Sequence, residues 1–448
     1  MAHVPRNLAL AALLAVPMAR AAEPPTLHYT VTPVLAQGDL QAVDVELVGE
    51  AGADGKLDVV LPGTQLALSS DGSLSAGEHG HLVLAGAPNA QLTLRYRRRG
   101  NDSLQREWDT DPYMAAGWLL APCSALLAMP ADNIARRVEV TWKLPARWRG
   151  LTNLPASTPT TTSAQSHSVC FLGRDVTEKV IPLGHGGHLR TYTTDPREAA
   201  PLVDLAVRAL TIVAADGDGR PADYPVFITS VDREGGGLSS WSQGAGMGMV
   251  LERGVAPGGV VAPMITDYRR LLAPGPADPA TAWYTEGLRS YQVVSDLLVS
   301  HTLDRGIVAA WFDQVSGQYG SSAFRRAPQS QVAAEWSSSP DLQALPMQRG
   351  MLFGALLDAR LREATRGTAT LGDVLRKIGP HPADPTGALI AAVRAAGGGD
   401  IAPLYEKYIV RGDLLLLPAD ALGACMAVRT DADGYGWQVQ RVSATCQP

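Results

Sequence analysis

The sequence predicts an α+β protein with more than one domain: an antiparallel β-sandwich at the N-terminus, followed by a mainly helical region. From Leu27 to about Leu154, apolar residues alternate with polar ones, which is the period of a strand with one buried face. From Trp283 almost to Arg411, apolar residues recur at helical spacing instead. A chain of 448 residues is long enough for two or three domains.

The composition is that of an ordinary globular protein. Apolar residues make up 46% of the chain and charged residues 18%, and the formal net charge is −6. This charge gives no electrostatic case for binding nucleic acid or an anionic membrane. A protein, a peptide or a small molecule is the expected partner.

The N-terminal end has the pattern of a secretory signal peptide, assigned to residues 1–22. Arg6 precedes an apolar run at residues 8–16, and small residues lead to a cleavage site after Ala21 or Ala22. No cysteine stands at that site, so a lipoprotein anchor is not indicated. Because no later segment has about eighteen uninterrupted apolar residues, we expect a periplasmic or secreted mature chain without a membrane span.

The chain has four cysteines, an even number, which are expected to form disulfides in an exported protein. Three pairings are possible, and the pairing of sequence neighbours is the simplest: Cys123 with Cys170, and Cys425 with Cys446. A zinc site is the alternative, but none of the four has the tight C-x2-C spacing that such sites use.

Residues 23–195 are assigned to the β-sandwich domain. Turn-forming clusters at residues 49–55 and 86–89 separate its alternating runs. The runs lie at residues 43–47, 57–61, 92–96 and 138–144. The basic segment at residues 95–99 suggests an edge strand kept from further pairing by its charge, and a polyanion-binding patch is the less common alternative.

Two histidines in a glycine-rich segment, His185 and His188, are a candidate metal pair. No Cys, Asp or Glu lies within several residues to complete a site, and a surface turn is the commoner structure for such a segment.

The glycine-rich segment at residues 235–250 holds two further candidates. Ser239 or Ser240 is a possible nucleophile, but the segment has no G-x-S-x-G elbow and no His placed beside it. The G-x-G-x-G at residues 244–248 lacks the following helix and the acidic partner of a dinucleotide site.

Residues 196–413 are assigned to one mainly helical domain, and residues 414–448 to a small β tail closed by Cys425 and Cys446. Apolar spacing predicts a strand at residues 224–228 and helices at residues 199–215, 283–291, 351–365, 371–378, 388–396 and 403–409.

Two helical segments, at residues 260–269 and 283–291, have the layout of a zinc-peptidase core. In such a core the first helix carries H-E-x-x-H, in which two His on one face bind the metal and the Glu is the general base. The next helix supplies a Glu as third ligand. Glu286 takes that place here, and Asp267 lies nineteen residues earlier (286 minus 267), where the second His belongs.

These segments, in this order, resemble the glycyl aminopeptidases, zinc peptidases with a thermolysin-like catalytic domain. The matching segments are Gly236-Gly-Leu238, Trp283-Tyr-Thr-Glu-Gly-Leu-Arg-Ser-Tyr291, Arg349-Gly350, Leu371-Gly-Asp-Val-Leu375 and Tyr408-Ile-Val-Arg-Gly412. The resemblance implies that residues 27–154 form the family's N-terminal β domain and that residues 196–413 have a thermolysin-like fold.

The chain departs from the family at the positions that carry the chemistry. The two metal-binding His, the base, the Glu-His of the substrate strand and the Tyr before Lys-Gly fall on Pro263, Asp267, Met264, Ser239, Ser240 and Met347. Only Glu286 remains of the ligands, so the resemblance implies no catalytic residue, no zinc and no other cofactor. Because proline lacks an N–H, Pro263 is also expected in the first turn of its helix.

Glu286 has two interpretations. It is either a carboxylate near a helix start, stabilised by the helix dipole or paired with Arg269, Arg270 or Arg289, or an anion left in a cleft that now recognises an amino group.

The expected function is that of an exported, non-catalytic peptidase homologue that binds or scaffolds a peptide or protein in a cleft between its domains. An active aminopeptidase-like hydrolase is the alternative, with a non-standard metal set such as His185 and His188, or with a nucleophile at Ser239 or Ser240. A purely structural envelope component is a third possibility.

Overall fold

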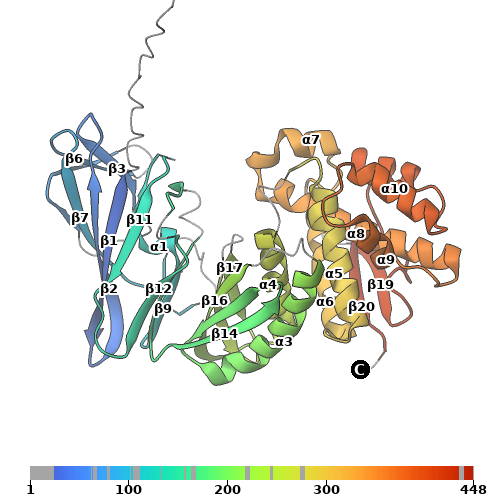
Figure 1. The fold of residues 1–448 in the computed structure, drawn as a ribbon, viewed down its shortest axis with the longest axis horizontal. Helices are drawn as coiled ribbons and strands as arrows, with labels where there is room; N and C mark the ends of the chain where they lie inside the picture. Colours follow the sequence, from blue (N-terminus) through green and yellow to red (C-terminus); the bar gives the residue numbers. More distant parts are fainter. Residues whose placement is uncertain are drawn as a thin grey trace, which may run out of the picture.

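The computed structural model describes the chain from residue 25 to residue 446, with gaps. The described residues are 25–61, 63, 68–77, 81–100, 102–103, 111–132, 134–155, 158–162, 168–216, 222–242, 246–272, 278–432 and 438–446. The predicted signal peptide, residues 1–22, lies outside them. In Figure 1 the chain runs from a group of strands, through a strand and helix region, to a group of helices.

Three sheets near the N-terminus contain the predicted alternating runs. The first sheet has the order β11-β1-β2-β7-β4 and comprises β1 (Thr26–Ala36), β2 (Asp39–Glu50), β4 (Leu68–Ser70), β7 (Gln91–Arg98) and β11 (Arg137–Trp142). The second has the order β10-β3-β6-β5 and comprises β3 (Lys56–Val60), β5 (Ser73–Ala76), β6 (His81–Ala85) and β10 (Met129–Pro130). The third has the order β12-β13-β9-β8 and comprises β8 (Tyr113–Ala115), β9 (Trp118–Pro122), β12 (Trp148–Thr152) and β13 (Val169–Arg174).

The three N-terminal sheets share one apolar core. Leu47 of the first sheet, Val59 of the second and Leu119 of the third are all fully buried members of it. The strands pair antiparallel except for β1 and β11, which run parallel, so the prediction of purely antiparallel pairing is wrong at this one pair.

The prediction that the basic segment at residues 95–99 is an edge strand is wrong for part of the segment, because β4 pairs with β7 at residues 94–96. The segment lies on β7, between β2 and the three-residue β4. Arg95 and Arg97 pair with carboxylates on neighbouring strands and turns, and Arg98 is fully buried with its Nη2 3.0 Å from Asp111. Arg95 has a paired strand on each side, whereas the described pairing of Arg97 and Arg98 is with β2.

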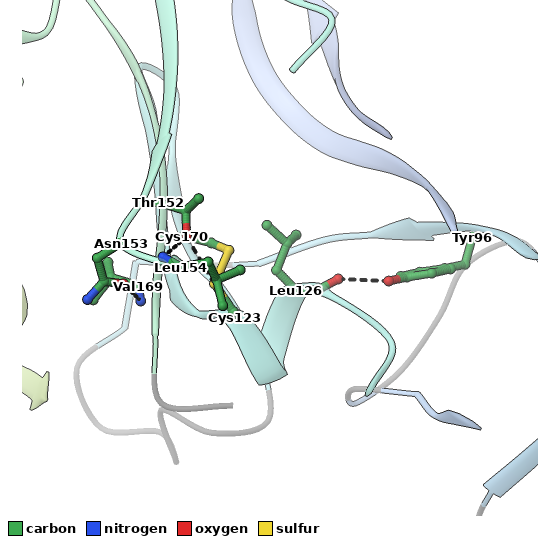
Figure 2. Close-up of a disulfide and its surroundings, with 8 residues drawn as sticks. All are labelled: Tyr96, Cys123, Leu126, Thr152, Asn153, Leu154, Val169 and Cys170. Atoms are coloured by element: carbon green, nitrogen blue, oxygen red, sulfur yellow. Dashed lines mark hydrogen bonds between the residues drawn. A yellow bond between two sulfur atoms is a disulfide. The ribbon is translucent and has the colours of Figure 1, made fainter. Parts of the chain in front are cut away.

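Both disulfides form between sequence neighbours, which confirms the simplest pairing. Cys123 begins the short helix α1 (Cys123–Leu126) and is bonded to Cys170 of β13, with a Cα–Cα distance of 5.1 Å. Figure 2 shows this bond beside Thr152, whose Oγ1 lies 3.6 Å from the Cys123 sulfur. Cys425 is bonded to Cys446 with a Cα–Cα distance of 4.9 Å.

A five-stranded sheet lies at the centre of the chain and is called the central sheet below. Its order is β14-β15-β16-β18-β17, with β14 (Thr177–Gly184), β15 (Gly187–Thr193), β16 (Asp223–Glu234), β17 (Leu238–Ser242) and β18 (Met247–Arg253). β15, β16 and β18 run parallel, and β14 and β17 are antiparallel edge strands. The sheet begins at Thr177, within the range that the sequence analysis assigned to the N-terminal domain.

The two faces of the central sheet have different covers. The helices α3 (Pro196–Asp216) and α4 (Pro257–Leu272) pack on one face and share its core. The other face meets the third N-terminal sheet through aromatic residues: the ring of Phe171 on β13 lies 5.8 Å from the ring of Phe227 on β16. Tyr192 of the neighbouring β15 stacks on the same Phe227 ring at 5.1 Å. The central sheet is therefore buried on both faces, as parallel sheets usually are.

The rest of the chain is helical down to Val410, followed by a short hairpin. The elements are η2 (Trp283–Leu288), α5 (Arg289–Val299), α6 (Arg305–Ser321), α7 (Gln329–Ala334), η3 (Trp336–Ser338), α8 (Pro340–Thr365), α9 (Leu371–Ile378), α10 (Pro385–Ala395), α11 (Ala402–Tyr405), η4 (Glu406–Val410), β19 (Met426–Ala432) and β20 (Gln438–Ala444). In Figure 1 the hairpin lies beside α6. Val428 and Val442 belong to the helical core, so the tail packs as part of that core.

Several predicted helices differ in the structure: the one at residues 351–365 is the end of α8, and the one at residues 403–409 continues from α11 into the π-helix η4. The segment at residues 283–291 starts as the π-helix η2 before α5 begins. The helix that contains Pro263 starts at Pro257, so Pro263 lies in its interior and the expectation that it stands in the first turn is wrong. The missing N–H of Pro263 leaves the helix one hydrogen bond short in its middle.

Candidate functional site

The helix α4 carries the three residues that the sequence comparison placed at the first His, the base and the second His of a zinc peptidase: Pro263, Met264 and Asp267. Met264 is 1% exposed and packs in the core beneath the central sheet. Asp267 is also 1% exposed, and Pro263 is half-buried. Two of the three side chains are thus enclosed by protein.

Asp267 lies beside Tyr224 of β16. Burial, and after it the nearby Asp267 carboxylate, raises the pKa of Tyr224 well above its usual value. The Tyr224 ring also packs against Tyr268, with the centroids 5.3 Å apart. Asp267 therefore sits against the aromatic residues under the central sheet, at the junction of α4 with β16.

Glu286 lies on the π-helix η2, and its side chain is 21% exposed. It pairs with Arg270 of α4, with the Arg270 Nη2 to Glu286 Oε2 distance at 3.8 Å. This geometry agrees with the first interpretation of Glu286, an ion pair with an arginine of the preceding helix. Arg289 is buried and donates instead to Gln292 and to the Leu375 carbonyl.

The segment η2 packs against α8 through two glycines. A Cβ atom on Gly350 would lie 2.1 Å from the Trp283 carbonyl oxygen, and one on Gly287 would lie 2.5 Å from the Gly350 Cα. No side chain fits at either position, because the two backbones are in direct contact. Met347, one turn before Gly350, is half-buried on the same helix.

The residues at the zinc positions do not fit a zinc ion. Proline offers no ligand atom, and the Met264 thioether is buried in the core. A catalytic zinc takes three protein ligands, usually including His. Across the described ranges, no group of three or more His, Cys, Asp or Glu side chains is arranged to hold a metal ion.

Ser239 and Ser240 lie on β17, the outermost strand of the central sheet. The Ser239 Oγ is 2.7 Å from the hydroxyl of Tyr113, which comes from the third N-terminal sheet. The Tyr113 ring stacks on Trp241 of the same strand as the serines, with the centroids 5.9 Å apart. The partner of Ser239 is thus a phenol, whereas activated serines usually contact an imidazole.

His185 and His188 flank the turn between β14 and β15, as the surface-turn interpretation expected. His185 adopts a left-handed backbone conformation with φ of 48°. The His188 Nδ1 lies 3.0 Å from Asp223 Oδ1, and Arg190 also donates to Asp223. The Asp223 carboxylate therefore already contacts both His188 and Arg190.

Three features of the site could not be predicted from the sequence: the contacts of Arg269 with η2, the contact of Asp267 with Tyr224, and the facing glycines. Arg269, one of the three predicted ion-pair candidates for Glu286, donates to two backbone oxygens and to the Ser290 hydroxyl. The glycines were in matching segments, Gly287 directly after Glu286 and Gly350 after Arg349, but no spacing in the sequence brings them together.

The fold is a multidomain, metallopeptidase-like one. No protein-family model matches the chain, and no curated protein matches it. Among solved structures it is similar to an aminopeptidase N family protein from Idiomarina loihiensis, with a TM-score of 0.59 and 14% identity over 91% of this chain and 79% of that one.

An M1 zinc metallopeptidase from Deinococcus radiodurans aligns over 88% of this chain and 95% of its own length, with a TM-score of 0.46 and 16% identity. The similarity to the Idiomarina loihiensis protein shows that this chain has a fold like that of an aminopeptidase N family protein.

Proposed function

We propose that the chain is an exported pseudopeptidase related to the glycyl aminopeptidases, which binds a peptide or protein without hydrolysing it. The observation that supports this most is the residue set Pro263, Met264 and Asp267 on α4. In such a pseudopeptidase the thermolysin-like arrangement of helices remains, but the protein binds no zinc and carries out no zinc-dependent hydrolysis.

Loss of hydrolysis follows from the chemistry of these side chains. A zinc peptidase needs a metal to activate water and a carboxylate to accept the proton. The thioether of Met264 accepts no proton at neutral pH, and its burial keeps it from water.

Binding is supported by the position of β17 at the edge of the central sheet. Alternate residues of an edge strand direct their N–H and C=O groups away from the sheet, where an extended peptide can pair with them. Leu238, Ser239 and Ser240 on this strand are half-buried, so the strand keeps some access to solvent.

Export is supported by the two disulfides together with the predicted signal peptide. Disulfides persist in oxidising compartments and are rare in the cytosol. In the part of the chain that the structure describes, no helix has the length and apolar character needed to cross a bilayer.

Metal analysis and an activity assay on the purified full-length mature protein test the proposal. We expect much less than one zinc ion per chain. We also expect no chelator-sensitive hydrolysis of aminoacyl or peptide substrates. Stoichiometric zinc with chelator-sensitive cleavage would overturn the proposal. Cleavage that persists with chelator and disappears in Ser239→Ala or Ser240→Ala would establish a serine hydrolase instead.

A peptide-array screen of the same protein tests the binding part. We expect selective capture of extended peptides, reduced by a proline at the position that pairs with β17. Absence of any selective binding would favour a purely structural envelope component.

A further inference from the structure

The helix α4 and the π-helix η2 are tied together by an arginine. The Arg269 Nη2 donates to the Thr285 carbonyl at 2.7 Å, and its Nη1 donates to the Ser290 hydroxyl at 2.7 Å and to the Glu286 carbonyl at 3.3 Å. One side chain of α4 thus spans the segment that carries Glu286.

The end of the π-helix η2 has backbone hydrogen bonds that pass over the Thr285 carbonyl. An α-helix bonds each N–H to the carbonyl four residues earlier, and a π-helix to the carbonyl five residues earlier. At the change from η2 to α5 the Arg289 N–H contacts the carbonyls of Tyr284 and Glu286. The Thr285 carbonyl, between them, accepts from Arg269.

A second, weaker link runs parallel to the first. Arg270 lies 3.8 Å from the Glu286 carboxylate, with 52% of the arginine side chain exposed. The Ser290 hydroxyl donates in turn to the Glu286 carbonyl at 2.5 Å. Glu286 is therefore held through its backbone oxygen and, more loosely, through its side chain.

In a zinc site whose ligands come from two helices, the metal joins those helices, and its binding free energy contributes to folding. The residues of α4 do not fit a zinc ion, yet η2 is still attached to α4. We propose that Arg269, assisted by Arg270, holds the two helices in register in place of a metal. Arg269 is then a positioning residue, and this inference rests on the proposed pseudopeptidase function.

The opposite side of η2 is fixed by α8. The Gly287 and Gly350 backbones are in contact there, so η2 is enclosed between α8 and the guanidinium of Arg269. Loss of Arg269 would release η2 on one side only, and the effect should be local.

Hydrogen exchange of the full-length mature protein, followed by mass spectrometry on peptides covering residues 283–290, tests this. In Arg269→Ala we expect exchange in these peptides to be roughly 30-fold faster, as for two net hydrogen bonds lost, with little change in the N-terminal sheets. Arg269→Lys keeps the charge but cannot reach all three oxygens, so a smaller local increase is expected. Arg360→Ala, an exposed arginine on α8, serves as the control and should leave these peptides unchanged.

Unchanged exchange in Arg269→Ala, or an equal increase across all peptides, overturns the proposal. If Arg269→Ala does not fold, Arg269→Lys decides by the same criterion. Chelator treatment of the unaltered protein separates the two proposals. Faster exchange at residues 283–290 after chelation would contradict the pseudopeptidase proposal, whereas an ineffective Arg269→Ala contradicts only the role of Arg269.

Discussion

Exposed arginines of the N-terminal strand β7 and two more enclosed arginines of the helical region make different contacts. On β7, Arg95 and Arg97 pair with carboxylate side chains on the exposed face of the sheet. In the helical region, Arg269 and Arg349 donate to backbone carbonyls of a neighbouring segment. Exposed ion pairs are screened by water and salt and stabilise little, whereas an enclosed carbonyl without a donor is costly. We therefore expect the arginine bonds to backbone carbonyls to fix the position of a helix. The ion pairs on the exposed face of the sheet should add little to its stability.

The buried Arg98 refines this comparison, because it belongs to the sheet region and still follows the helical pattern. It is fully buried, donates to the Ala125 carbonyl at 3.1 Å and pairs with Asp111. Arg98 therefore makes both kinds of contact, and a bond to backbone is not confined to the helical region.

The largest effect is expected where two backbones touch. In Gly350→Ala the new methyl group would lie 2.1 Å from the Trp283 carbonyl oxygen, so η2 must move away from α8. We expect a loss of about 3 kcal/mol or more in the free energy of unfolding, measured by urea denaturation.

Gly259→Ala is the matched control for this prediction. Gly259 lies on the helix α4, is exposed, and has no atom within 4 Å of the position that an added methyl group would take. Alanine favours helix over glycine, so this variant should be unchanged or more stable by about 0.5 to 1 kcal/mol. Equal stability of the two variants would show that η2 and α8 are not in backbone contact.

A smaller loss is expected from the buried arginine of α8. Arg349 is 1% exposed, and its Nη2 donates to the carbonyls of Arg325 and Ala327 at 3.2 and 2.8 Å. Burial lowers its pKa from the usual arginine value, which shows that the charge is poorly solvated. Arg349→Ala removes both hydrogen bonds and the packed stem, and should cost about 2 to 3 kcal/mol in urea denaturation.

Two companion variants separate the causes. Arg349→Met keeps most of the stem, so its difference from Arg349→Ala reports packing, and its difference from the unaltered protein reports the hydrogen bonds. Arg326→Ala removes an exposed arginine next to the same carbonyls and should have no effect. A loss in Arg326→Ala as large as in Arg349→Ala would contradict the backbone role of Arg349.

Much of the fold could be predicted because its signals are local. The alternation at residues 43–47 and 92–96 lies within β2 and β7, and the predicted helix at residues 371–378 coincides with α9. The disulfides join cysteines that are neighbours in sequence. The strands and the helix follow from a pattern within one segment, and the disulfides follow from pairing each cysteine with its nearest neighbour in the sequence.

The remaining features depend on contacts between segments that are distant in sequence. The edge prediction for β7 was wrong at residues 94–96, because β4, which pairs there, has only three residues and no recognisable pattern. The start of α4 was misplaced because Pro263 is tolerated in the helix interior, where tertiary packing outweighs the lost hydrogen bond. Arg269 was one of three arginines named as possible partners of the Glu286 carboxylate, and Arg270 makes that pair. Arg269 donates to the carbonyls of Thr285 and Glu286, a contact that no spacing in the sequence reveals.

The smallest effect is expected on the exposed face of the first N-terminal sheet. Arg97 of β7 lies opposite Asp44 of β2, and its Nη2 is 2.8 Å from Asp44 Oδ2, yet both side chains are about half-exposed. Because solvent screens such a pair, Arg97→Ala and the double variant with Asp44→Ala should unfold at the same urea concentration as the unaltered protein within error. The test is a double-mutant cycle at low and at high salt. A salt-independent coupling energy between Arg97 and Asp44 as large as the stability loss in Arg349→Ala would contradict the distinction between exposed and enclosed arginines. It would also remove the reason to expect a larger effect from Arg269 than from a surface charge.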